Sequence, residues 1–451
     1  MSKIEEEKKS FRDRLNQVSP SFCLAKWLQV TMHLHSGHNH SCHHPATHKT
    51  PLEELKFNPS ALHNTCFKKD QRLKMKSGAR PAECQYCWNI EDLGENYFSD
   101  RTLKSSEFWA APYLEDVASL SANANINPTY VEVSFSNVCN FKCSYCSGNF
   151  STRWKDEIQR YGSYPTKSGE QTMEILSEDN NPYIKAFWEW WPELIKDLKV
   201  FRITGGEPLL SKNTFRVLEE LSRNPMPNLE VAINSNLGVS DATFQKFLAL
   251  AKDLTENKKV KFFRLFTSAE AWGEKAEYIR NGLDFIRFQR NLESFLQEVP
   301  QGQAIVMSTF NALSLTSFET FLAYIKSLKE IYTKDPSHCP IFIDVSYLRH
   351  PTYQSIQVLP ESYQNHMKEI LQFMESRQIH KNDPGGFYFF ETTKVQRIYE
   401  WMKQPLAEAD LRTRRKEFYS FFNEHDRRRG TNFLQSFPEM RAFWDQCKEL
   451  N

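Results

Sequence analysis

Residues 138–148 read VCNFKCSYCSG, three cysteines at C-x-x-x-C-x-x-C spacing, directly after the segment YVEVSF at 130–135. That segment alternates apolar, β-branched residues with others, as a β-strand does. Three thiolates on one short loop suit an iron–sulfur cluster, because soft thiolate ligands favour iron and sulfide. A [4Fe–4S] cluster with three protein ligands keeps its fourth iron open to an external ligand. The loop therefore predicts a catalytic cluster and not a purely electron-transferring one.

Outward from this loop, short apolar runs alternate with amphipathic helical stretches between residues 128 and 350. Such alternation predicts βαβ units, a parallel sheet and an α/β fold. Six units predict a partial (β/α)6 TIM-type barrel with its chemistry at the carboxyl ends of the strands. The expected strands are 130–135, 200–203, 230–233, 261–266, 303–308 and 341–346, and the expected helices are 185–198, 213–222, 240–250, 272–281, 285–297 and 317–331.

A second motif, Gly205-Gly206-Glu207-Pro208, closes the next expected strand. Two glycines let backbone carbonyls approach a ligand closely, and Glu207 supplies a negative charge. A C-x-x-x-C-x-aromatic-C loop after one strand, followed by this motif after the next, resembles the radical S-adenosylmethionine (SAM) superfamily. The resemblance implies an enzyme that reductively cleaves SAM at a [4Fe–4S] cluster to a 5′-deoxyadenosyl radical. That radical abstracts a hydrogen atom from a substrate C–H bond.

The resemblance also implies a set of site residues. Cys139, Cys143 and Cys146 would bind the cluster, and SAM would chelate its open iron. Glu207 would receive the SAM amino group, and Arg280 fits a partner for the SAM carboxylate by residue type. The residues expected to bind SAM are Tyr145, Gly205, Gly206, Glu207, Pro208, Asn234, Ser235, Ser268 and Arg280.

Four further cysteines lie in the segment 21–93, upstream of the barrel. Cys23 opens FCLAKW, Cys42 lies in HNHSCHHP, and Cys84 and Cys87 form ECQYCW. The arrangement resembles the auxiliary-cluster module called SPASM or, when shortened, twitch. The resemblance implies a second [4Fe–4S] cluster with all four irons held by the protein.

Two features of this segment depart from that module. The module usually follows the barrel but here precedes it, and His43 stands where a second cysteine of the pair is usual. Zinc is the alternative, because it accepts both cysteine and histidine, and seven histidines lie between His33 and His48. Cys66 has no counterpart in the pattern and is expected to be a free thiol. The role of the histidine-rich segment stays open.

The composition of the chain indicates which partners and which cellular location to expect. Its 451 residues carry 57 Lys+Arg and 56 Asp+Glu, so no global field favours nucleic acid or an anionic membrane. Residues 1–20 are charged throughout and are expected to form a frayed leader and no signal peptide. With no apolar run of 18 residues, no membrane span is expected. We expect a cytoplasmic protein, where clustered thiols are metal ligands more often than disulfides.

The region 351–451 is expected to be a helical extension. Its Arg runs at 411–416 and 426–429 are expected to form a solvated helix face, while the aromatic residues among them match a core at helical spacing. A nucleic-acid module built on these helices is an alternative that we do not expect, and a zinc-stabilised protein without catalysis is another. For the enzyme, the expected partners are an electron donor such as flavodoxin or ferredoxin and a peptide or protein substrate. A small metabolite is the alternative substrate.

Overall fold

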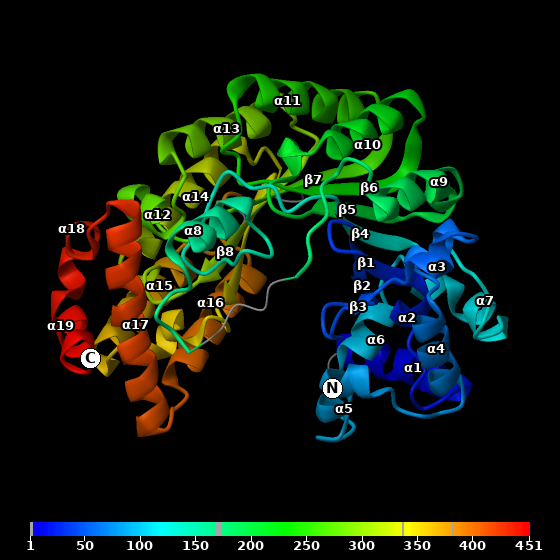
Figure 1. Cartoon of the computed structure of the whole chain (residues 1–451), viewed down its shortest axis with the longest axis horizontal. Helices are drawn as coiled ribbons and strands as arrows, with labels where there is room; N and C mark the ends of the chain where they lie inside the picture. Colours follow the sequence, from blue (N-terminus) through cyan, green and yellow to red (C-terminus); the bar gives the residue numbers. More distant parts are fainter. Residues whose placement is uncertain (1–2, 168–172, 336–337, 381–382) are drawn as a thin grey trace. The chain divides into compact units, whose positions relative to one another are not determined.

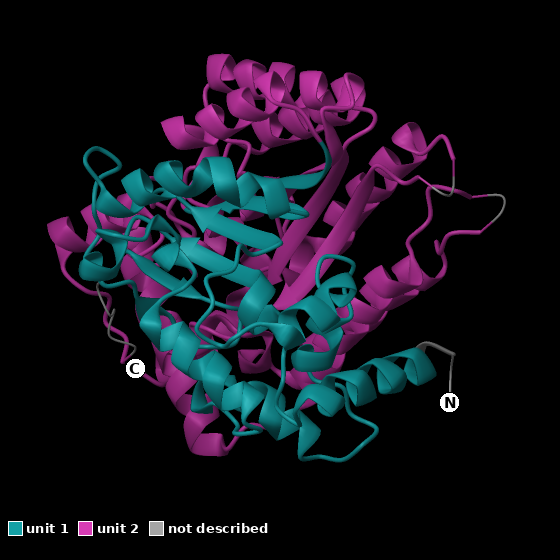
Figure 2. Ribbon diagram, turned by 90° about the vertical axis from the view of Figure 1, so that its right-hand side faces the viewer, with its two compact units in different colours: residues 1–136, 174–205, 227–232 teal, residues 137–173, 206–226, 233–451 magenta. Residues whose placement is uncertain are grey.

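The computed structural model describes the chain except for residues 1–2, 168–172, 336–337 and 381–382. The chain divides into two compact units, which Figure 2 colours separately. Unit 1 comprises residues 1–136, 174–205 and 227–232, and unit 2 comprises residues 137–173, 206–226 and 233–451. The loop with three cysteines belongs to unit 2, and the four upstream cysteines belong to unit 1. The sequence-based domain boundaries at 20, 93, 128 and 350 remain predictions.

Unit 1 is built on strands β1 to β5 and the unit-1 part of β6, labelled in Figure 1. Their order is β3-β2-β1-β4-β5-β6, with β1 antiparallel to β2 but parallel to β4, and β4 parallel to β5. In β4, Val131 and Val133 are fully buried while Glu132 is half-buried, as the alternating sequence predicts. The strands are β1 (Gln29–His33), β2 (His38–His40), β3 (His48–Lys49), β4 (Tyr130–Ser134), β5 (Val200–Thr204) and β6 (Met226–Asn234).

The helices of unit 1 include one at the very start of the described chain. Helix α1 (Lys3–Val18) buries Leu15 completely, and Arg12 donates to the backbone oxygen of Glu95 at 2.6 Å. The expected frayed leader is therefore wrong, because one apolar stripe on this charged helix is enough to pack it. The others are α2 (Ala25–Leu28), α3 (Leu52–Leu55), α4 (Cys66–Lys76), α5 (Gln85–Glu91), α6 (Asp100–Ser105), α7 (Leu114–Ser119) and α9 (Pro182–Asp197).

Unit 2 carries the last residues of β6 and three further parallel strands in the order β6-β7-β8-β9. The strands are β7 (Val260–Ser268), β8 (Gln303–Phe310) and β9 (Ile341–Tyr347). Helices between them follow the expected ranges closely, and Ser211 and Ser240 cap two of them by accepting hydrogen bonds from backbone N–H groups. The expected helices of unit 2 are present as α10 (Lys212–Arg223), α11 (Asp241–Glu256), α12 (Gly273–Ile279), α13 (Phe285–Glu298) and α14 (Phe318–Tyr332), whereas helix α8 (Thr152–Tyr161) was not expected.

The carboxyl-terminal part of unit 2 is helical, as expected. Its helices are α15 (Gln364–Glu375), α16 (Phe389–Lys403), α17 (Glu408–Arg429), α18 (Phe433–Ser436) and α19 (Arg441–Glu449). Phe418, Phe421 and Phe422 of α17 are buried, which confirms them as core. The solvated face expected for the Arg run at the end of α17 is only partly right: Arg427 is exposed, but the side chains of Arg428 and Arg429 are buried.

All six expected strands are present as β4 to β9. The result is a mixed α/β fold of mostly parallel strands with a helical carboxyl-terminal part, compatible with a partial TIM-type barrel. Strands β1 to β3 were not expected. Because β1 pairs with β4 along five residues, the histidine-rich segment extends the parallel sheet of unit 1. No helix in the described part of the chain is long and apolar enough to cross a membrane.

Candidate functional site

The loop with three cysteines in unit 2 is fixed by bonds from both sides. Its backbone N–H groups at Lys142 and Ser144 donate to the oxygens of Asn281 and Ile279 at 2.9 and 2.7 Å. On the other side, Trp154 Nε1 donates to the oxygen of Cys143 at 2.7 Å. Ser151 caps α8 and also donates to the oxygen of Phe141 at 2.6 Å. The loop is therefore shaped before any ligand binds.

The thiols of Cys139, Cys143 and Cys146 are free and half-buried. Burial raises the pKa of all three, that of Cys139 to about 12. A buried neutral thiol loses its proton when it binds a metal ion. These three thiols therefore suit a group that contains positively charged iron. Three thiols on a preformed loop fit a [4Fe–4S] cluster with one iron left without a protein ligand.

The expected Gly-Gly-Glu-Pro motif lies against this loop because two of its residues have no side chain. A Cβ on Gly206 would lie 2.4 Å from the oxygen of Val138, and the N–H of Glu207 donates to the same oxygen at 2.8 Å. Gly205 adopts φ +131°, a backbone conformation that L side chains rarely adopt. Pro208 opens a short 3₁₀ turn that leads to α10.

Glu207 follows β5, and its carboxylate is hydrogen-bonded to residues that follow β6. It accepts from Leu209 N at 3.0 Å, from Ser235 Oγ at 2.9 Å and from Asn236 N at 2.6 Å. Burial raises its pKa to about 7, although the three donors oppose that shift. Of its roughly four acceptor positions, one remains on Oε2 for a further donor. Asn236 also places Nδ2 3.9 Å from Cys139 Sγ.

The side chain expected to meet the SAM carboxylate already has a carboxylate partner. Arg280 is buried and binds Glu270 with Nη2–Oε2 at 2.5 Å, while its Nη1 lies 3.8 Å from Cys143 Sγ. Tyr145 donates its hydroxyl to Glu270 at 3.1 Å, and its ring lies 5.6 Å from the Arg280 guanidinium. Burial would lower the pKa of Arg280, but Glu270 outweighs this and the pKa is raised.

Glu270 is a site residue that the sequence analysis missed. It stands two residues beyond the end of β7, where parallel strands present functional side chains, and that position was the available signal. Of the other expected residues, Ser268 ends β7 opposite Met307, and Asn234 ends β6 with Nδ2 3.7 Å from Met307 Sδ. They lie at neighbouring strand ends, at the edge where the chemistry is expected.

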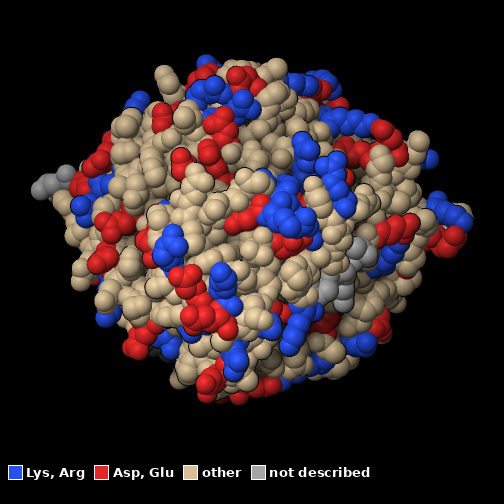
Figure 3. Space-filling view, turned by 60° about the vertical axis from the view of Figure 1, so that its left-hand side comes forward, with Lys and Arg blue, Asp and Glu red and all other residues tan. Residues whose placement is uncertain are grey.

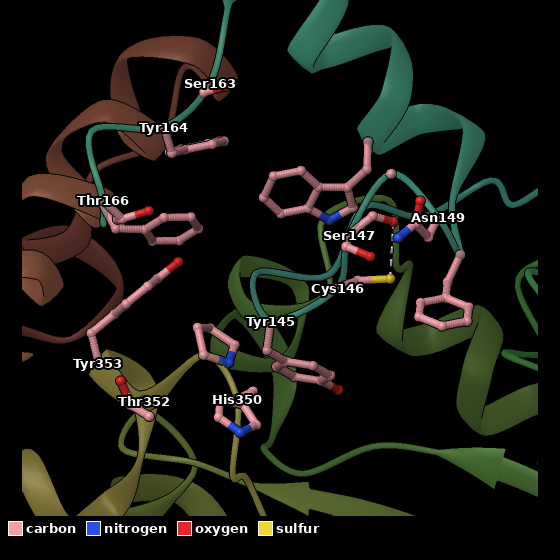
Figure 4. A pocket seen from close by; sticks show the side chains of 15 residues that line it. Tyr145, Cys146, Ser147, Asn149, Ser163, Tyr164, Thr166, His350, Thr352 and Tyr353 are labelled. Carbon is pink, nitrogen blue, oxygen red and sulfur yellow. Dashed lines mark hydrogen bonds between the residues drawn. The ribbon is translucent and has the colours of Figure 1, made fainter. Parts of the chain in front are cut away.

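A cavity of about 460 Å³ adjoins the cysteine loop in unit 2 (Figure 4). Tyr145 and Cys146 line it from the loop, and Tyr164 and Tyr353 line it from other segments, with their rings visible in the close-up. Trp154 and Phe421 complete an aromatic wall. The cavity is large enough for a planar, partly apolar ligand and reaches a cluster cysteine directly.

The four upstream cysteines come together in unit 1. Cys23, Cys42, Cys84 and Cys87 line one pocket, and three of them share a buried core with Trp27 and Trp88. Burial raises the pKa of Cys42 to about 11 and that of Cys84 and Cys87 to about 12. The sequence placed these four thiols in one site, and the fold brings them to one place.

Buried cations lie next to that pocket. Lys26 lines it and forms an ion pair with Glu83, and Arg101 lines it and binds Glu91 at 2.8 Å. Lys68 and Arg72 are also fully buried, yet no carboxylate in the described residues bonds to either. Lys68 instead donates to the oxygen of Gln29 at 3.1 Å, and Arg72 donates to Asn64 Oδ1 at 3.0 Å.

Lys68 and Arg72 are thus hydrogen-bonded to backbone and amide oxygens and to His63. Burial and neighbouring cations lower the pKa of Lys68 well below its usual value, while the carboxylate of Glu83 and then the thiol of Cys42 oppose the shift. In the described chain, the buried Nε1 of Trp27 has no hydrogen-bond acceptor. A [4Fe–4S] cluster with four thiolates is an anion with sulfur acceptors, so these residues fit it.

The histidines form contacts of their own in unit 1. His33 Nε2 and His40 Nε2 lie 3.4 Å apart, and His40 Nδ1 donates to the oxygen of Cys42. Burial lowers the pKa of His33 to about 3 and that of His35 to about 4. Among the described residues, no three His, Cys, Asp or Glu side chains are grouped as ligands of one metal ion. Cys66 is exposed at the start of α4.

Two curated proteins are similar to parts of this chain. One is a GTP 3′,8-cyclase of Pasteurella multocida (strain Pm70), 25% identical over 198 residues, which is 44% of this chain and 50% of the relative. The other is a GTP 3′,8-cyclase of Nautilia profundicola (strain ATCC BAA-1463 / DSM 18972 / AmH), 28% identical over 109 residues, 24% of this chain and 27% of the relative. The chain thus spans half of one relative's length and about a quarter of the other's. No protein-family model matches it.

Proposed function

We propose, on the radical SAM superfamily assignment that the two cyclases support, that this chain cleaves SAM reductively at a [4Fe–4S] cluster bound by Cys139, Cys143 and Cys146. When bound, the cluster and SAM supply a 5′-deoxyadenosyl radical that abstracts hydrogen from a substrate C–H bond. The observation that carries the proposal is the preformed three-cysteine loop packed against Gly206 and Glu207.

The chain's own residues would hold and orient SAM. The remaining acceptor position on Glu207 Oε2 suits the SAM ammonium, and the aromatic cavity beside Cys146 suits its adenine. Ser235 and Asn236 fix the Glu207 carboxylate and keep it pointing at one place. The aromatic rings of Trp154, Tyr164 and Phe421 line that cavity and would contact the adenine.

The test is anaerobic reconstitution, followed by iron and sulfide analysis and by SAM cleavage with dithionite. The variant Cys139→Ala/Cys143→Ala/Cys146→Ala should lose all cleavage and about four irons. Cys66→Ala, which removes an exposed thiol, is the matched control and should keep both. Cleavage that survives in the triple variant would refute the proposal.

We also propose that Cys23, Cys42, Cys84 and Cys87 bind a second, auxiliary [4Fe–4S] cluster. The support is their shared pocket, together with the buried Lys68 and Arg72. Four cysteine ligands leave no iron open, so the role proposed for this cluster is electron transfer. Zinc is the alternative occupant, and metal analysis of the triple variant decides between them: about four remaining irons support the cluster, whereas one zinc and no iron rule it out.

The substrate is the least constrained part of the proposal. A peptide or protein substrate, expected from the auxiliary module, stays a prediction. A small metabolite is the second candidate, because both relatives are named for an activity on GTP. Formation of 5′-deoxyadenosine, measured with GTP and separately with a peptide fraction of the host cell, would distinguish them, since a true substrate stimulates turnover.

A further inference from the structure

The Arg run at the end of α17 is mostly buried, which is unusual for arginine. Lys and Arg side chains ordinarily lie at the surface, where Figure 3 shows them spread among acidic and uncharged residues. Arg427 follows this rule with 60% of its side chain exposed, whereas the side chains of Arg428 and Arg429 are 1% and 0% exposed. Arg428 binds Glu424 of its own helix and the backbone of residues 162–163. A buried guanidinium costs free energy unless its partners compensate it, so the contacts of Arg429 indicate its role.

Arg429 holds the loop with three cysteines through the backbone of that loop. Its Nη1 donates to the oxygen of Lys142 at 2.7 Å, and Lys142 immediately precedes Cys143. Its guanidinium also lies over the Trp154 ring, 4.9 Å from the ring centroid. Trp154 Nε1 in turn donates to the oxygen of Cys143 at 2.7 Å. Two successive carbonyl groups of the loop are therefore bound, one by Arg429 itself and one by the ring against which Arg429 packs.

The same guanidinium belongs to a group of buried ion pairs behind the loop. Nη2 of Arg429 lies 3.1 Å from Oε1 of Glu157 and Nε lies 3.2 Å from Oε2, so the pair is bidentate. Lys142 and the hydroxyl of Tyr164 bind the same carboxylate. Burial would raise the pKa of Glu157, but Arg429 and the other donors lower it to about 2, so Glu157 is ionised at neutral pH. Two cations and one carboxylate leave a net charge of one positive unit, two minus one, beside the loop.

Another part of the loop is held without charge. Ser144 Oγ donates to Gln354 Oε1 at 2.9 Å, and Gln354 Nε2 donates to the oxygen of Ser144 at 3.0 Å. Gln354 is fully buried. Arg429 and Gln354 therefore both fix the loop, but Arg429 brings a charge to it and Gln354 does not. Substitutions at these two positions can separate the effect of position from the effect of charge.

We propose that Arg429 is a positioning residue for the loop with three cysteines, and that its buried charge raises the reduction potential of the cluster bound there. A cluster that takes up one electron gains one negative charge, which a nearby cation stabilises. Buried charges are screened much less than exposed ones, so Arg429 should act on the cluster more strongly than Arg427 does. The inference rests on the proposed function.

The experiment is a redox titration of the reconstituted full chain, followed by electron paramagnetic resonance on the signal that SAM changes. Arg429→Gln should shift the potential of that cluster to a lower value, and Arg429→Lys, which keeps the charge, should stay closer to the parent. Arg427→Gln is the matched control, because it makes the same substitution two residues away at an exposed position, and it should leave the potential unchanged. A parent-like potential in Arg429→Gln, or an equal shift in Arg427→Gln, would overturn the role of the charge.

Two further variants separate charge from position. Gln354→Ala removes a neutral contact of the loop and should leave the potential near the parent value; a shift as large as that of Arg429→Gln would overturn the role of the charge. Glu157→Gln removes the negative charge beside Arg429 and should raise the potential. This variant keeps Arg429 in the chain and so tests the proposal even where Arg429→Gln does not fold, and an unchanged or lowered potential in it would contradict the proposal.

The proposed function can fail separately. If the parent binds no iron at the loop and does not cleave SAM, the radical chemistry is wrong, and alkylation of the metal-free chain still tests the positioning. Mass spectrometry of the peptide that contains Cys143 should show faster alkylation in Arg429→Gln than in the parent or in Arg427→Gln, because the loop is held less tightly. Equal alkylation rates in the three proteins would overturn the positioning role.

Discussion

The two thiol sites of this chain are surrounded by different charges. In unit 2, Arg280, whose Nη1 lies 3.8 Å from Cys143 Sγ, is neutralised by Glu270 before any ligand binds. In unit 1, Lys68 and Arg72 are buried with no bonded carboxylate in the described residues. Net positive surroundings stabilise the more negative, reduced state of a cluster, and a neutral ion pair does so less. Lys26, Arg101 and Lys104 line the cysteine pocket of unit 1 against one lining carboxylate, Asp100, so the cluster proposed there should have the higher reduction potential.

The largest effect is expected from removing two ligands of the unit 1 site. Cys84→Ala/Cys87→Ala should lose about four irons and lower the thermal unfolding midpoint, because the cluster proposed there would form part of the core of that unit. SAM cleavage with dithionite should persist, since the unit 2 loop keeps its own ligands. Iron analysis, calorimetry and the cleavage assay measure the three outcomes. Equal loss of SAM cleavage in this variant would show that the two sites are not independent.

Acid should destabilise unit 1 through its histidines. Burial lowers the pKa of His33 and of His48 to about 3, against about 6.5 in the unfolded chain. Between these values the unfolded state binds more protons, so stability is fully present above pH 6.5 and falls as the pH drops toward 3.

The unfolding midpoint, measured across that pH range, should fall less steeply in His33→Gln/His48→Gln than in the parent. His366→Gln, at an exposed position on α15, should leave the slope unchanged. Identical slopes in all three proteins would contradict the account of the buried histidines.

The Arg280–Glu270 ion pair in unit 2 allows a test in which two substitutions should shift the reduction potential in opposite directions. Arg280 lies 3.8 Å from Cys143 Sγ, so Arg280→Gln removes a positive charge and should lower the potential of the unit 2 cluster. Glu270→Gln removes the compensating negative charge and should raise that potential. Redox titration followed by electron paramagnetic resonance (EPR) measures both shifts. Glu274→Gln, at an exposed position on α12, is the control. Shifts of the same sign in the two variants would rule out an electrostatic cause.

The smallest effect is expected from one buried cation of unit 1. Lys68→Met keeps most of the side-chain volume but removes the amino group, which a bound anion would keep protonated, and it should lower the potential of the cluster proposed for unit 1 only. Lys69→Met, one residue along α4 and less buried, should leave the potential near the parent value. The same redox titration reports both clusters. A shift confined to the unit 2 signal would show that the unit 1 charges do not serve the cluster.

The sequence predicted correctly those elements whose residue types alone indicate the local structure. The strands β4 to β9 were predicted because their apolar and β-branched residues alternate, and the two cysteine groups because clustered thiols are rare. Strand β1 was missed although QVTMH alternates polar and apolar residues; the segment is short, and its pairing with β4, about a hundred residues away, is set by the tertiary fold. Burial of Lys68 and Arg72 could not be predicted, since such residues are almost always exposed. Glu270 belongs to no motif that sequence spacing reveals.

We propose that, of the two clusters, only the one in unit 2 has an iron open to SAM. The most direct measurement is the EPR spectrum of the reduced protein, recorded with and without SAM, in two variants. In Cys84→Ala/Cys87→Ala, SAM should change the spectrum of the remaining cluster. In Cys139→Ala/Cys143→Ala/Cys146→Ala, SAM should leave the remaining spectrum unchanged. A SAM-dependent change in the second variant, or none in the first, would contradict the account.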